Sequence, residues 1–173
     1  MSHIIALAKK LNFVKPDPRC GLDEERMSAY LKQRGIRKLP DDFLEFLGEF
    51  NGGELMQVAC FNGSDMCYWK ILGFGGDDDI TKVFGFFGVD GSLDVCYMPI
   101  AYDFFGNYFL MSFRYRKGEE GAIYFWNHEI GWEKNKDKDR DIDASTVADE
   151  SIKIADSFTE FLEKSQILPD SLI

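Results

Sequence analysis

The first fifty residues carry apolar side chains at the three- and four-residue spacing that is typical of amphipathic helices. This pattern predicts helices over residues 2–11, 24–34 and 40–50. Asp23 suits the N-cap of the second helix, and Gly35 suits the position just after its last turn. Pro40 suits the start of the third helix, and Asn51 suits its end because Asn tolerates positive φ.

From residue 54 the pattern changes to short runs of β-branched, aromatic and other apolar residues, separated by turn signals such as Asn62-Gly63 and Gly106-Asn107. Consecutive strands that are joined by short turns pair antiparallel. The runs predict strands over residues 55–61, 67–74, 80–87, 95–102, 108–115 and 122–126.

A last helix is predicted after Ser157, which has the S-x-x-E spacing of a capping box with Glu160. Residues 133–143 are rich in charge and poor in apolar side chains, which is typical of a loop. Helices, then strands, then a helix indicate an α+β fold, with a mainly antiparallel twisted sheet of about five or six strands. The N-terminal helices and the C-terminal helix pack on this sheet and bury Phe43, Phe46, Leu47, Phe158, Phe161 and Leu162. A length of 173 residues fits a single domain over 1–173.

The chain is acidic, with 30 Asp and Glu against 20 Lys and Arg and a formal net charge of -10. Nucleic acids and anionic membranes attract clusters of Lys and Arg, so we expect neither as a partner. The excess of acid either keeps the protein soluble or attracts a basic protein, and both interpretations stay open here.

Compartment and metal content are predicted from the N-terminus and the cysteines. Lys9 and Lys10 follow apolar residues, the reverse of the order in a secretory signal, and no apolar run approaches the roughly 20 residues of a membrane span. We therefore expect a cytoplasmic protein. The cysteines form no C-x-x-C pair, so we expect free thiols, no metal site and no cofactor. They are Cys20, Cys60, Cys67 and Cys96.

Several short motifs follow one another in an order that is more specific than any one of them. They are Leu39-Pro40-x-x-Phe43-x-x-Phe46-Leu47, Asn51-Gly52-Gly53-Glu54-Leu55, Pro99-Ile100-Ala101 with Asp103 and Gly106-Asn107, Gly121-Ala122-Ile123-Tyr124-Phe125-Trp126-Asn127-His128-Glu129, and Ile154-Ala155-x-Ser157-Phe158-x-x-Phe161-Leu162. This order resembles the SUKH superfamily, the Smi/Knr-like domain, over about residues 22–164. The resemblance implies an α+β fold without a catalytic constellation. It also implies kinship with bacterial immunity proteins, which bind a toxin, often a nuclease, and protect the cell that makes them.

The resemblance and the charge together predict a non-enzymatic binding protein. We expect an immunity protein that neutralises a basic cognate toxin of a polymorphic or contact-dependent toxin system. In a nuclease toxin the acids would occupy the cleft in place of phosphates. A regulatory protein-interaction module without a toxin partner is the alternative, and a small hydrolase is the third hypothesis.

The candidate partner-binding residues are acids beside predicted turns, where a scaffold presents side chains on loops. The three consecutive acids of the Asp77 turn form a solvated turn, a partner contact or a cation site, in that order of preference. The full set is Glu54, Asp77, Asp78, Asp79 and Glu129.

Two other polar pairs have both a catalytic and a structural interpretation. His128 with Glu129 could act as a base and its orienting carboxylate, and Glu54 with Asp103 could act as a glycosidase pair. We favour structural roles, because no nucleophile motif accompanies His128 and because Asp103 suits a tight turn with Gly106-Asn107. We therefore expect no catalytic residue.

Overall fold

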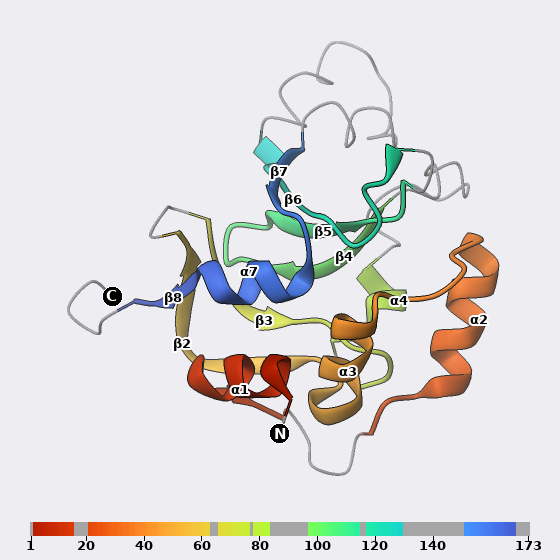
Figure 1. Cartoon of the computed structure of the whole chain (residues 1–173), viewed down its shortest axis with the longest axis horizontal. Coiled ribbons are helices and arrows are strands. Elements are labelled where there is room, and N and C mark those ends of the chain that lie inside the picture. The colour runs from red at the N-terminus through yellow and green to blue at the C-terminus, as the bar shows by residue number, and fades with distance from the viewer. Residues whose placement is uncertain are drawn as a thin grey trace.

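The structure is a computed structural model of the chain. It describes residues 2–15, 21–62, 66–76, 78–83, 97–114, 117–129 and 151–168. They form five helices and one eight-stranded antiparallel sheet (Figure 1). The predicted α+β class is confirmed, and the sheet has more strands than the expected five or six.

The helices begin and end at the residues that their caps dictate. Asp23 Oδ1 accepts a 2.9 Å hydrogen bond from Arg26 N at the start of the second helix, and Gly35 ends that helix with φ 64°. Ser157 Oγ likewise accepts from Glu160 N at 3.0 Å. The helices are α1 (His3–Lys10), α2 (Glu24–Arg34), α3 (Asp41–Phe50), α4 (Ile80–Val83) and α7 (Phe158–Lys164).

Helix α4 corrects the strand predicted over 80–87, of which residues 84–87 lie outside the described part of the chain. The apolar run that suggested a strand begins directly after Asp79. Asp79 Oδ1 accepts a 2.8 Å hydrogen bond from Thr81 N, and this side-chain cap starts a helical turn instead.

The strands of the sheet run in the order β1-β2-β3-β4-β5-β6-β7, and β8 pairs with β2 off this path. Five strands lie within or overlap predicted ones. The other three, β1, β7 and β8, were not predicted, because runs of two to four residues are too short for an alternating pattern to stand out. The strands are β1 (Phe13–Val14), β2 (Gly53–Phe61), β3 (Cys67–Ile71), β4 (Tyr97–Tyr102), β5 (Tyr108–Ser112), β6 (Ile123–Trp126), β7 (Ile152–Ala155) and β8 (Ser165–Ile167).

Strand β2 is irregular in its middle, and on its edge away from β3 it pairs with two strands, β1 and β8. Its register against β3 shifts between Glu54 and Ala59, where β2 holds extra residues. The first part of β2 pairs with β1 through Leu55, and the last part pairs with β8 through Ala59.

The predicted helical core residues are confirmed, since all six are 0–1% exposed. The Phe158 ring lies 4.9 Å from that of Phe43 and 5.1 Å from that of Phe46, which joins α7 to α3. The Phe161 ring lies 5.4 Å from the ring of Phe109 on β5, which joins α7 to the sheet. In Figure 1, α7 crosses in front of the sheet between β8 and β7.

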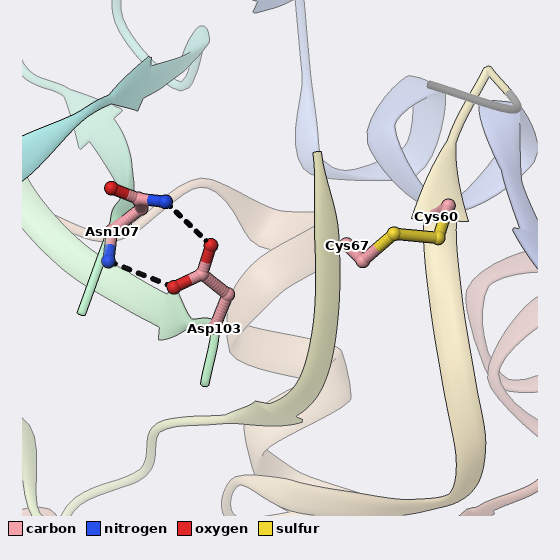
Figure 2. Close-up of a disulfide and its surroundings, with 4 residues drawn as sticks. All are labelled: Cys60, Cys67, Asp103 and Asn107. Atoms are coloured by element: carbon pink, nitrogen blue, oxygen red, sulfur yellow. Dashed lines mark hydrogen bonds between the residues drawn. A yellow bond between two sulfur atoms is a disulfide. The ribbon is translucent and has the colours of Figure 1, made fainter. Parts of the chain in front are cut away.

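The expectation of free thiols is wrong for one pair of cysteines. Cys60 and Cys67 form a disulfide between β2 and β3 (Figure 2). The two residues are direct Cα partners across the strands, and the register that brings them together could not be derived from the sequence. Cys20 and Cys96 lie outside the described residues.

Candidate functional site

A row of polar and aromatic side chains crosses the sheet on the face opposite α7. Each residue of the row is the direct Cα partner of the next, and such partners share one face of a sheet. In the neighbouring row, Phe109 contacts Phe161 of α7, so the alternation of side chains places the polar row on the other face. The row consists of Glu54, Lys70, Tyr102, Tyr108 and Trp126, and we call it the cross-strand row.

Lys70 lies at the centre of the charged part of this row. Its Nζ is 2.7 Å from Asp78 Oδ2 and 3.7 Å from Glu54 Oε1. The Lys70 side chain is 13% exposed, whereas that of Glu54 is 42% exposed. Two carboxylates thus share one ammonium group, and the more exposed carboxylate faces solvent.

Tyr102 completes this arrangement by donating a 3.1 Å hydrogen bond from its hydroxyl to Asp78 Oδ1. Burial raises the pKa of Tyr102 above its ordinary value, and the negative charge of Asp78 raises it further. Tyr102 therefore keeps its proton near neutral pH and acts as a donor that fixes Asp78 in place.

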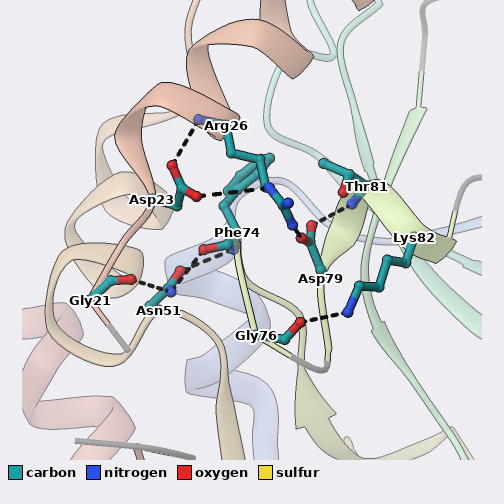
Figure 3. A network of polar contacts seen from close by, with 9 residues as sticks. All are labelled: Gly21, Asp23, Arg26, Asn51, Phe74, Gly76, Asp79, Thr81 and Lys82. Carbon is teal, nitrogen blue, oxygen red and sulfur yellow. Dashed lines mark hydrogen bonds and ion pairs between the residues drawn. The ribbon is translucent and has the colours of Figure 1, made fainter. Parts of the chain in front are cut away.

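Asp79, the next residue, has a different environment (Figure 3). Its side chain is fully buried and forms an ion pair with Arg26 of α2. Burial alone would raise the pKa of Asp79, but hydrogen bonds from Thr81 and the Arg26 guanidinium outweigh it and hold that pKa below its usual value. The interpretation of the acidic turn as solvated is therefore wrong at Asp79. Asp77 lies outside the described residues.

The segment before Asp79 is held by Asn51, at the end of α3 (Figure 3). Asn51 Nδ2 donates to the carbonyl oxygens of Gly21 and Phe74, at 2.8 and 2.9 Å, and Asn51 Oδ1 accepts from Phe74 N at 3.0 Å. A Cβ atom on Gly73 would lie 2.3 Å from the Asn51 carbonyl oxygen, so this approach requires glycine. These contacts give a structural role to Asn51, the first residue of the Asn-Gly-Gly motif.

Glu129 lies elsewhere on the sheet, just after β6, and is exposed. The neighbouring His128 contacts Asn107 and not Glu129: Asn107 Oδ1 accepts from His128 N at 3.1 Å and lies 3.0 Å from His128 Nδ1. His128 thus follows the end of β6, as expected, but its hydrogen bonds reach Asn107, 21 residues away, and are not local.

The structural role predicted for Asp103 is also confirmed (Figure 2). Asp103 Oδ1 accepts from the backbone N–H groups of Phe105 and Asn107, both at 2.8 Å. Asp103 Oδ2 accepts from Asn107 Nδ2 at 2.7 Å. The carboxylate is thus occupied by the β4–β5 turn, which holds the turn in one conformation.

The structure brings together only some of the predicted site residues. Glu54 and Asp78 meet at Lys70, while Asp79 turns toward Arg26. Glu129 follows β6, four strands away from β2, or about 19 Å along the sheet. Of the described candidate acids, only Glu54 and Asp78 therefore form a group, and the sequence did not identify Lys70 and Tyr102, which join them.

In the part of the chain that the structure describes, no group of three or more His, Cys, Asp or Glu side chains could hold a metal ion. Among the same residues, no helix is long and apolar enough to cross a membrane.

Comparison with known proteins agrees with the resemblance seen in the motifs. The sequence model of the SMI1 / KNR4 family (SUKH-1) matches residues 21–164, from just before α2 to the end of α7. A search of the curated proteins finds no match. The family match covers most of the chain, includes the motifs that suggested the SUKH superfamily, and leaves α1, β1 and β8 outside it. The chain belongs to the SMI1 / KNR4 family (SUKH-1).

Proposed function

We propose that this protein is a non-enzymatic immunity protein, which binds and neutralises a cognate toxin of a polymorphic or contact-dependent toxin system. The observation that carries the proposal is the family match over residues 21–164. The net charge of -10 supports it, because a basic partner would be attracted over a distance and would arrive faster. A toxin whose active site binds phosphates has such a basic surface.

The acids that we propose for partner contact are Glu54, Asp78 and Glu129, together with Asp77. The side chain of Glu54 is more exposed than that of its row neighbour Lys70. Asp78 is held in place by an ion pair with Lys70 and a hydrogen bond from Tyr102. Asp79 is buried and forms an ion pair with Arg26, so we propose that it stabilises the fold and does not contact the partner. Neutralisation would proceed by steric occlusion, with carboxylates in place of the anion that the toxin binds.

We also propose that the protein acts in the cytoplasm, where a toxin would reach its target. The structure shows the Cys60–Cys67 disulfide closed. Disulfides are rare in the cytoplasm, so the proposed location predicts that this bond is reduced in a part of the molecules in the cell. Alkylation of free thiols in intact cells, followed by mass spectrometry of the peptides, measures the reduced fraction. A fully oxidised pair would contradict the proposed location.

The experiment for the proposed function is protection of a host that expresses the toxin encoded beside this gene. Co-expression of this protein should restore growth and yield a stable complex with that toxin on purification. A toxin of the same activity from an unrelated locus serves as the control and should remain lethal. If the neighbouring genes encode no toxin and no basic partner binds, the proposal gives way to a regulatory interaction module.

A further inference from the structure

Two adjacent phenylalanines lie at the surface in the turn between β4 and β5. Phe104 is 67% exposed and Phe105 is 77% exposed, whereas the nearby aromatic residues Phe109 and Trp126 are 0% and 3% exposed. Exposed aromatic side chains that lie together on a soluble protein mark interaction sites more often than chance would place them there.

The turn that carries them is fixed in shape. Asp103 accepts three hydrogen bonds from within the turn, and two of these come from backbone N–H groups, including that of Phe105. On the far side, Asn107 accepts from His128 N after β6, so the turn is tied to a neighbouring strand. Asp103 and Asn107 are both buried, at 5% and 8% exposed. The aromatic rings are therefore presented by a rigid support, which lowers the entropy that a partner must remove on binding.

The surroundings of the turn indicate the chemistry of what it contacts. The exposed carboxylate of Glu129 follows His128, whose ring lies close to Gly106 of the turn. Residues 103–107 contain no basic side chain, and the whole chain carries a charge of -10. The turn thus combines apolar anchors with negative charge, which complements an apolar pocket that has a basic rim.

We infer that the β4–β5 turn is the central contact with the toxin, and that Phe105 inserts into an apolar pocket whose basic rim meets Glu129. This inference rests on the proposed function and names Phe105 as the side chain that anchors the toxin. Interfaces commonly draw most of their affinity from a few aromatic side chains that are buried on binding and surrounded by polar contacts. In the complex, Phe104 beside the anchor would help to exclude water from it.

The test is the affinity of full-length variants for the purified toxin domain encoded beside this gene, measured by calorimetry. Phe105→Ala should raise Kd about 30-fold, the change expected for a hot-spot residue. The matched control is Met56→Ala, which removes another exposed apolar side chain, 71% exposed on β2, and should change Kd less than threefold. Both variants should keep the melting temperature of the parent, because neither side chain is in the core.

The outcomes separate this inference from the proposed function. If the parent protein binds the toxin and Phe105→Ala weakens binding less than tenfold, the inference is overturned and the proposed function stands. If the parent does not bind the toxin at all, both are overturned. If Phe105→Ala instead abolishes a dimer of the parent in sedimentation experiments and leaves toxin affinity unchanged, the turn contacts a second copy and the inference is overturned.

Discussion

The side chain of Asn51 pairs with the backbone of Phe74 in the way that one strand pairs with another: its Oδ1 accepts from Phe74 N at 3.0 Å and its Nδ2 donates to Phe74 O at 2.9 Å. The same amide also reaches Gly21 at the start of the segment before α2. One side chain thus connects the end of α3, the approach to α2 and the segment that leads to α4 (Figure 3). Asn51 also has φ 45°, which few residues other than Gly adopt easily.

Replacement of Asn51 by Ala should therefore lower the free energy of unfolding by about 3 kcal/mol. Buried partners lose their hydrogen bonds, and Ala is less tolerant of positive φ. The matched control is Asn12→Ala, at an exposed residue with φ 59°, which should lower it by about 1 kcal/mol. Urea denaturation measures both. Equal losses in the two variants would show that only the backbone conformation matters at Asn51.

Truncation of a buried phenylalanine on α3 or α7 should be among the substitutions that destabilise the fold most. Phe46→Ala or Phe158→Ala should lower the free energy of unfolding by about 3–5 kcal/mol, because each ring is fully buried and leaves a cavity. Leu44→Ala, on α3 but 38% exposed, is the control and should cost less than about 1 kcal/mol. A loss below about 1 kcal/mol for Phe46→Ala would exclude it from the core.

Reduction of the disulfide should destabilise the protein by a moderate amount. Cys60 and Cys67 are 7 residues apart, so the bond closes a short loop and its effect on the unfolded chain is about 2.5 kcal/mol. Reductant should lower the melting temperature by about 5–10 °C. The double variant Cys60→Ser with Cys67→Ser should melt at the lower temperature with or without reductant. A parent protein that is insensitive to reductant would contradict the prediction.

The buried carboxylate of Asp79 should make the fold sensitive to acid. Its pKa is lower in the folded protein than in the unfolded chain, so its contribution is complete above the unfolded value, about 3.9, and is lost as the pH falls through the folded value. Asp79→Asn should lower stability near neutral pH and flatten the decline between about pH 5 and pH 2.

Denaturation of the Asp79→Asn variant at several pH values checks this prediction. The control is Asp41→Asn, whose carboxylate is 88% exposed in the parent and whose loss should leave the pH profile nearly unchanged. Parallel pH profiles for the parent and Asp79→Asn would show that the Arg26 ion pair does not contribute to acid stability.

Association with the toxin should depend on salt, since attraction between separated charges is screened within about 10 Å at 0.1 M ionic strength. We expect the association rate constant to fall about tenfold between about 0.02 and 0.5 M salt in stopped-flow measurements. Glu54→Gln with Glu129→Gln should reduce this fall. Glu45→Gln with Glu49→Gln removes the same charge from exposed positions on α3 and should keep the parent dependence. Identical behaviour of the two double variants would refute the proposed contact acids.

The helices could be predicted from the sequence because their signals are local. Asp23, Gly35 and Ser157 act within one turn of the helix that they start or end, and the pattern displays such spacing directly. The error over residues 80–83 also arose at a local signal: Asp79 caps α4, whereas the sequence pattern had placed that residue in an acidic turn.

The candidate site could be predicted only in part, because it depends on pairing between distant segments. Glu54, Lys70 and Tyr102 become neighbours only through the register of β2, β3 and β4, which includes a shift within β2. The burial of Asp79 likewise depends on Arg26, which is 53 residues away in the chain. Acidic residues beside a turn look alike in the sequence whether solvent, a cation or an arginine faces them.

The disulfide can also serve as a probe of folding, because its formation shows when β2 and β3 pair. The two sulfur atoms meet only when Cys60 is opposite Cys67, and a slip by one residue would turn one of them to the other side of the sheet. The reduced chain could therefore be refolded and given a brief pulse of oxidant at different times. The fraction of chains that form the Cys60–Cys67 disulfide would then show when this hairpin closes. The time of disulfide formation can be compared with the time at which the aromatic side chains give the spectroscopic signal of a fixed environment. The comparison shows whether the hairpin closes before the core packs.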